Sequence, residues 1–304
     1  MKKILFLFSF IFIQIQAQID TVKIAANLTP EQIAQNDYNT GLNYLNNHNP
    51  SMAIQLFSQA LQNLPSFEKA LYNRALAYLQ LKNYFEALKD INQAIQLKPI
   101  DEYYFTKSLI FFYQDKKDSQ EQVLLKTLTI NPNHPEANYY LGMLYFTYQD
   151  YDKAISHYQK AIQSRSDYAY AYNDLASAYL MKNDLENAIK NYELAAKYAP
   201  NQAFIFNNLG SAYRQKKDYT KAIEAYRKAI MIDENYFLAY INSGAARLEK
   251  GDIIGAKTDF ENVIKKDPRH SAAYNGLAGV YIKEKDYKKA KEMATKAIDL
   301  DPNN

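Results

Sequence analysis

The stretch that decides the fold runs from Tyr172 to Pro200 and reads YNDLASAYLMKNDLENAIKNYELAAKYAP. In its second half, Ala188 is followed by an aromatic residue four positions later and by another alanine three positions after that. Spacings of three, four and seven residues place side chains on one face of an α-helix. The closing proline lacks a backbone donor and marks a helix end. The stretch therefore predicts a helix, a short polar turn and a second helix.

The same pattern recurs along most of the chain with a fixed period. Alanines equivalent to Ala188 stand 34 residues apart, except for one step of 67 residues that holds a blurred copy. A period of this size is typical of one helical hairpin repeated and stacked, because a single hairpin cannot bury its apolar face alone. Sustained two-residue alternation is absent, so the sequence predicts an all-α protein. The periodic alanines are Ala53, Ala87, Ala154, Ala188, Ala222, Ala256 and Ala290.

Most first helices carry a small residue at one place and an aromatic residue three positions later, although the seventh copy has Arg247 at the aromatic place. Glycine or alanine at such a place lets two helices approach closely, and the aromatic ring fills the adjoining gap. In the third copy we expect Leu109 and Phe112 to occupy these two places. In the other copies the small residues are Gly41, Ala75, Gly142, Ala176, Gly210, Gly244 and Ala278.

The hairpins resemble the tetratricopeptide repeat family, whose skeleton is a large residue, Leu-Gly or Leu-Ala, Tyr, Ala, an aromatic, Ala and Pro. The resemblance implies an α–α superhelix, a solenoid of about eight helix-turn-helix units over residues 34–304. The third copy, about 102–134, is degenerate because it is one residue short and has Gln120 in place of the periodic alanine. We therefore expect a bend or a specialised surface there. The quoted copy carries the skeleton as Tyr172, Leu175, Ala176, Tyr179, Ala188, Tyr192, Ala195 and Pro200.

Residues 1–17 have the composition of a secretory signal peptide, with a basic start, a short apolar run and Ala17 at the expected cleavage position. The apolar run is shorter than the roughly 20 residues that span a bilayer, although an uncleaved anchor is the alternative. We expect export to the periplasm or the cell surface, with no stable membrane insertion of the mature chain. Residues 18–33 form an N-terminal extension and cap, in which Thr29 and Gln32 complete a capping box.

Composition and motifs argue against catalysis. The absence of cysteine excludes disulfides, thiolate metal sites and cysteine nucleophiles. A net charge of +3 gives little attraction to phosphate backbones, so no nucleic-acid partner is expected. Glycine-rich phosphate loops and nucleophile elbows are also absent from the sequence. We expect no catalytic residue, metal or cofactor. The four histidines are predicted to be surface residues: His48, His134, His157 and His270.

The resemblance implies that the first helix of each unit lines a concave groove along which a partner lies. Tyrosine suits such an interface because it joins a rigid ring to a polar tip, although many of these rings could instead fill gaps between helices. The predicted contact residues are Tyr72, Tyr103, Tyr113, Tyr139, Phe146, Tyr170, Asn173, Asn207 and Arg214. Asparagines at one equivalent place either hold a partner's backbone amides or are simply common there in the family. They are Asn39, Asn73, Asn208 and Asn242.

The leading functional hypothesis is a non-catalytic scaffold that binds another protein or a peptide in the groove. A second hypothesis is a module that binds glycans or cell-wall fragments, for which we expect clustered exposed rings with Asp or Asn alongside. A third hypothesis is self-association, because the last unit has no further helix to cover it.

Overall fold

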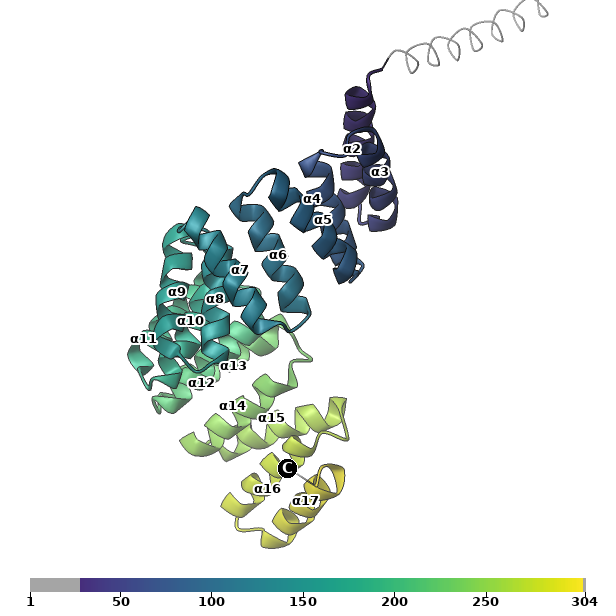
Figure 1. Cartoon of the computed structure of the whole chain (residues 1–304). Coiled ribbons are helices and arrows are strands. Elements are labelled where there is room, and N and C mark those ends of the chain that lie inside the picture. Colours follow the sequence, from purple (N-terminus) through teal and green to yellow (C-terminus); the bar gives the residue numbers. More distant parts are fainter. Residues whose placement is uncertain (1–27, 303–304) are drawn as a thin grey trace, which may run out of the picture. The chain divides into compact units, whose positions relative to one another are not determined.

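The computed structural model describes residues 28–302, and this part of the chain is all-α, as predicted (Figure 1). Sixteen helices occur in the described residues, and they pair in chain order into eight hairpins. The first three hairpins are formed by α2 (Pro30–Asn46), α3 (Pro50–Asn63), α4 (Glu68–Gln80), α5 (Tyr84–Leu97), α6 (Asp101–Tyr113) and α7 (Lys117–Ile130).

The chain divides into two compact units, which we call the first unit and the second unit. The first unit ends at Pro132 and contains α2 to α7, and the second unit begins at Asn133. The division therefore falls at the end of the degenerate third copy. The second unit contains α8 (Pro135–Thr147), α9 (Tyr151–Ser164), α10 (Ala169–Met181), α11 (Leu185–Tyr198), α12 (Ala203–Gln215), α13 (Tyr219–Ile232), α14 (Phe237–Lys250), α15 (Ile253–Lys266), α16 (Ser271–Lys283) and α17 (Tyr287–Leu300).

One residue in the turn of each hairpin adopts the left-handed conformation that ends a helix and reverses the chain. Gly251 has this role in the seventh hairpin with a φ of 91°. The other seven turns use residues with side chains, at φ values from 54° to 63°. Those residues are His48, Lys82, Asp115, Gln149, Asn183, Lys217 and Lys285.

The next residue in the turn caps the second helix. In every hairpin but the third, its side-chain oxygen accepts a hydrogen bond from the backbone amide three residues later, which satisfies one of the free donors at the helix start. Lys116 stands at this place in the third hairpin and makes no such bond. The capping residues are Asn49, Asn83, Asp150, Asp184, Asp218, Asp252 and Asp286.

Glycines in the first helices admit large rings from the second helices. A Cβ atom on Gly142 would lie 2.5 Å from the ring of Tyr158, which is 1% exposed. Gly41, Gly210 and Gly244 stand in the same relation to rings on their own second helices. The aromatic ring therefore takes the place of a side chain on the first helix.

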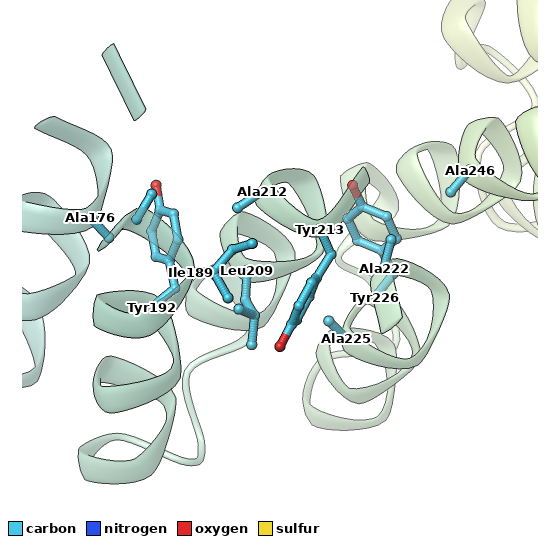
Figure 2. Close-up of a cluster of buried hydrophobic side chains, with 11 residues drawn as sticks. Ala176, Ile189, Tyr192, Leu209, Ala212, Tyr213, Ala222, Ala225, Tyr226 and Ala246 are labelled. Atoms are coloured by element: carbon cyan, nitrogen blue, oxygen red, sulfur yellow. The ribbon is translucent and has the colours of Figure 1, made fainter. Parts of the chain in front are cut away.

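The apolar core continues from hairpin to hairpin within each unit. In the second unit, Tyr192 and Ile189 of α11 and Leu209 and Tyr213 of α12 belong to one buried cluster, which Tyr226 of α13 extends (Figure 2). Because neighbouring hairpins share these side chains, stacking buries the apolar face that each would otherwise expose.

The third hairpin shows that the predicted register was wrong by one residue. Ser108, with no exposed surface, occupies the small place, whereas Leu109 is partly exposed. The aromatic place three residues later is therefore filled by Phe111 and not by Phe112. The loop before α6 contains only residues 98–100, against four residues in the loop before α4. The missing residue of the third copy thus lies in that loop, and α6 begins one position early.

The predicted N-terminal capping box is confirmed. Thr29 N donates to Gln32 Oε1 at 2.9 Å, and Gln32 N donates to Thr29 Oγ1 at 3.3 Å. The predicted signal peptide, residues 1–17, lies outside the described residues. Between residues 28 and 302, no helix has the length and apolar character needed to cross a membrane.

Candidate binding surface

The first helices of successive hairpins contact one another within each unit. In the first unit α4 contacts both α2 and α6. In the second unit α8 contacts α10, and α14 contacts both α12 and α16. We call the surface that these helices form the first-helix face of a unit. It is the surface on which the contact residues were predicted.

The first-helix face of the first unit contains a groove of about 640 Å³ across α2, α4 and α6. Its floor is apolar because leucines from all three helices converge there. We call it the leucine groove. The apolar residues that line it are Leu45, Leu76, Leu79, Tyr84, Leu109 and Tyr113. Polar groups of Asn46, His48, Asn73, Gln80 and Lys82 complete its lining.

Two of the predicted contact residues in the first unit lie against each other instead of standing open. The rings of Tyr72 and Tyr103 stack with centroids 4.7 Å apart, and Tyr72 Oη donates to Glu102 Oε1 at 3.0 Å. Tyr103 is only 4% exposed, and burial raises its pKa to about 12. The register shift explains this burial, because Tyr103 takes the place in α6 that the buried Ala70 takes in α4. Tyr103 therefore offers a partner little surface, and its role as a contact residue stays a prediction.

Tyr113 is the predicted residue that lies in the leucine groove, and its side chain is 57% exposed. The leucines of the groove were missed by the sequence reasoning. A signal for them existed, because the groove leucines recur as Leu45 and Leu79, 34 residues apart, and as Leu76 and Leu109, 33 residues apart. With the third copy one residue short, this recurrence matches the repeat period.

The aromatic residues predicted in the second unit are partly engaged in packing. Tyr139 Oη donates to Asp174 Oδ2 at 2.8 Å, and the Tyr139 ring lies 5.0 Å from that of Tyr168. Phe146 is partly buried and meets Tyr151 edge to face at 5.5 Å. Tyr170, in contrast, is 47% exposed.

Asparagines connect the first helices of the second unit to one another. Asn208 Nδ2 donates to Asn173 Oδ1 at 3.1 Å, and Asn242 Nδ2 donates to Asn207 Oδ1 at 2.8 Å. Asn173 and Asn207 are buried. These bonds favour a structural role for the asparagines, because each links helices of adjacent hairpins. The prediction that a partner contacts Asn173 and Asn207 stays a prediction.

Arg214, the predicted cationic contact, already has an anionic neighbour. Its Nη2 lies 2.6 Å from Glu249 Oε1, and its Nε lies 3.1 Å from both carboxylate oxygens. The pair joins α12 to α14, and hydrogen bonding to Glu249 raises the pKa of Arg214. A partner's carboxylate would therefore have to compete with Glu249 for Arg214.

The prediction of surface histidines is wrong for His134, which is buried, and for His157 and His270, which are partly buried. His134 is 5% exposed and caps α8, where its Nδ1 accepts a hydrogen bond from Ala137 N at 3.3 Å. His157 is partly buried, and its ring stacks on that of Tyr145 with centroids 5.4 Å apart. Burial lowers the pKa of His157 to about 4. The His157 ring is therefore neutral near pH 7 and serves as a packing group. No group of metal-binding side chains occurs in residues 28–302.

Comparisons with known proteins agree with the hairpin geometry. Sequence models described as "Tetratricopeptide repeat" match residues 68–101, 135–168, 169–202, 203–236 and 247–304, which is more than half of the chain. The chain belongs to the tetratricopeptide repeat family. Members of this family generally act as scaffolds for protein–protein interaction and are generally non-catalytic.

The curated relatives of this tetratricopeptide repeat protein share little sequence identity with it. Human tetratricopeptide repeat protein 6 is 26% identical over 107 residues, which are 35% of this chain and 21% of that protein. The chain thus spans about a fifth of that relative's length.

Solved tetratricopeptide repeat structures share the fold. The C-terminal part of a repeat protein from Cytophaga hutchinsonii has a TM-score of 0.64 at 18% identity, covering 79% of this chain and 99% of that one. YrrB, described as a tetratricopeptide repeat protein with an unusual peptide-binding site, has a TM-score of 0.51 at 24% identity and covers 60% of this chain and 93% of its own.

Proposed function

We propose that this protein is a non-catalytic scaffold that binds a peptide segment of another protein in the leucine groove. The observation that carries the proposal is the meeting of Leu76, Leu109 and the exposed Tyr113 in one groove on α4 and α6. Contiguous accessible apolar surface on a folded unit is characteristic of interaction sites. Exposed aromatic rings beside such surface commonly supply binding energy.

The chemistry of the lining favours a peptide with apolar anchors. Leucine side chains offer no hydrogen bonds, so they suit apolar side chains better than sugar hydroxyls. The amides of Asn73 and Gln80 and the ammonium group of Lys82 lie at the same groove and could bond to a peptide backbone. The description of YrrB as a peptide-binding repeat protein is consistent with this class of ligand.

The test is a selection of peptides from a phage-displayed library on the full chain. Enriched peptides are labelled, and their affinity is measured by fluorescence anisotropy. Leu109→Asp and Tyr113→Ala should each weaken binding by about tenfold or more, because one places a charge in the apolar groove and the other removes an exposed ring.

Phe85→Ala is the matched control. Phe85 is 76% exposed on α5 of the same unit and does not line the groove. Circular dichroism should show unchanged helicity for all three variants. Equal loss of affinity in Phe85→Ala, or unchanged affinity in both groove variants, would rule out the leucine groove as the binding site.

We also propose that the protein is exported, with the scaffold acting in the periplasm or at the cell surface. The support is the basic start, short apolar run and Ala17 of residues 1–17. Mass spectrometry of the N-terminus in an envelope fraction tests this, since cleavage after Ala17 should leave Gln18 as the first residue. An intact N-terminus in a cytoplasmic fraction would contradict export.

A further inference from the structure

A carboxylate without a cationic partner lies on the first-helix face of the second unit. Asp174 of α10 accepts hydrogen bonds from Tyr139 Oη at 2.8 Å and from Asn173 Nδ2 at 2.9 Å. No lysine, arginine or histidine of residues 28–302 forms an ion pair with it. Its side chain is partly buried, and this burial raises its pKa. Both of its partners are neutral, so a negative charge on Asp174 is hydrogen-bonded but not balanced by a cation of the described part of this chain.

Two other aspartates, Asp90 and Asp259, whose side chains are 1% and 13% exposed, are treated differently. Asp90 is paired with Arg74, whose Nε lies 2.6 Å from its Oδ2. Asp259 is paired with Arg247, whose Nε lies 3.0 Å from its Oδ2. Buried charges in proteins are normally paired because an isolated charge is costly to remove from water. Asp174 differs from these two aspartates because it has no arginine partner within residues 28–302.

The surroundings of Asp174 are aromatic. Tyr170 precedes it by one helical turn on α10, so both side chains lie on the same face of that helix. The Tyr170 ring is 47% exposed and stacks on Phe204 of α12 with centroids 6.0 Å apart and planes 15° apart. The Tyr139 ring packs against that of Tyr168. Aromatic faces attract cations and also cover the aliphatic stems of long basic side chains.

We propose that Asp174 and Tyr170 form a subsite for a lysine or arginine side chain of a bound protein segment, with Asp174 as the counter-charge and Tyr170 as the ring against which the stem packs. The inference rests on the proposed scaffold function, but it uses a surface of the second unit and not the leucine groove. It assigns a basic residue to the partner. The partner's cation supplies the positive charge opposite Asp174 that none of the chain's described residues supplies.

The test compares peptide selections on the wild-type chain and on the Asp174→Asn variant. Asparagine keeps an oxygen that can accept from Tyr139 and removes only the charge. Peptides selected on the wild type should carry Lys or Arg at a fixed place. Exchange of that residue for Gln should weaken binding by about tenfold, and Asp174→Asn should weaken it by a similar factor. The two changes together should cause no further loss.

Asp167→Asn is the matched control, because Asp167 is an exposed aspartate in the loop before α10. It should bind the selected peptides like the wild type. The melting temperature of Asp174→Asn should equal or exceed that of the wild type, since an unbalanced buried charge is removed. A purely structural Asp174 would instead show a lower melting temperature with an unchanged preference for basic peptides.

Three results would overturn the proposal. One is an equal content of Lys and Arg in the two selections, and another is the recovery of no peptide that depends on Asp174. The third is binding of chitohexaose that Tyr170→Ala abolishes and Asp174→Asn leaves intact, which would assign the rings to a glycan. Leu109→Asp is measured on the same peptides. Loss of binding in Asp174→Asn but not in Leu109→Asp would reject the leucine groove and support this subsite. Loss of binding in Leu109→Asp but not in Asp174→Asn would reject this subsite and support the groove.

Discussion

The ring of Tyr158 occupies the space that the absent side chain of Gly142 leaves between α8 and α9. A Cβ atom at residue 142 would lie 2.5 Å from two ring carbons, closer than such atoms approach in real proteins. Gly279 of α16 offers a contrast, because a Cβ atom there would lie 3.4 Å from Leu248. The two helical glycines should therefore respond in opposite ways to the same substitution.

Gly142→Ala is expected to lower the free energy of unfolding by about 1–3 kcal/mol, because the added methyl group overpacks the ring. Gly279→Ala should raise it by about 0.5–1 kcal/mol, because alanine is the better helix former and the methyl group fits. Urea denaturation followed by circular dichroism measures both. Equal stability of Gly142→Ala and the wild type would show that the Tyr158 ring can move to admit the added methyl group.

Lys116→Asp should stabilise the third hairpin. Lys116 has φ −92° and ψ 73°, close to the −91° and 77° of the capping residue Asp184, yet it makes no capping bond. An aspartate there should raise the free energy of unfolding by about 1 kcal/mol. The reciprocal change, Asp184→Ala, should cost a similar amount in the fifth hairpin. A chemical-denaturation midpoint that does not move for Lys116→Asp would contradict this expectation.

Lys217→Gly and Gly251→Ala form a second reciprocal pair. Lys217 holds a left-handed φ of 63°, which costs a residue with a side chain about 1 kcal/mol, and Gly251 holds 91°. Lys217→Gly should therefore raise the melting temperature, because glycine adopts the left-handed conformation without strain. The rise should be slight, because glycine also makes the unfolded chain more flexible and so increases the entropy lost on folding. Gly251→Ala should lower it by the equivalent of about 1 kcal/mol. A melting temperature that falls in Lys217→Gly would show that its side chain makes a stabilising contact in the turn.

The aspartate caps predict how stability depends on pH. Hydrogen bonds from the side chain and the backbone amide of Asn187 lower the pKa of Asp184 below its unfolded value. A group with a depressed folded pKa stabilises the protein fully above the unfolded pKa of about 3.9, and this contribution is lost as the pH falls through the folded pKa. The melting temperature should therefore be steady near neutral pH and fall below about pH 4.

Asp184→Asn isolates the contribution of one cap, because asparagine caps helices as well as aspartate does and carries no proton that titrates. The melting temperature of this variant should fall less steeply than that of the wild type below about pH 4. Identical pH profiles would contradict a role of the Asp184 charge. Asp167→Asn, in an exposed loop residue, serves as the control for removal of one carboxylate.

The hairpins were predictable from the sequence because their period is set by strictly spaced alanines such as Ala154 and Ala188. The register of α6 was not, because Ser108 and Leu109 are adjacent and only the length of the preceding loop decides which of them is buried. The groove was missed because leucine is as common in a core as on a binding face. The asparagine bonds between helices were also beyond prediction, since they depend on distances between neighbouring hairpins.

The bond from Asn208 to Asn173 and the bond from Asn242 to Asn207 each span 35 residues of sequence. If one whole copy, residues 174–207, were excised, Asn242 would come to stand 35 residues after Asn173 and could take over the acceptor that Asn208 had used. The second unit can thus gain or lose entire copies without leaving a side-chain amide without its hydrogen-bond partner at this contact. Gene duplication or loss within it would be tolerated at this contact, whereas a gain or loss of a few residues would not.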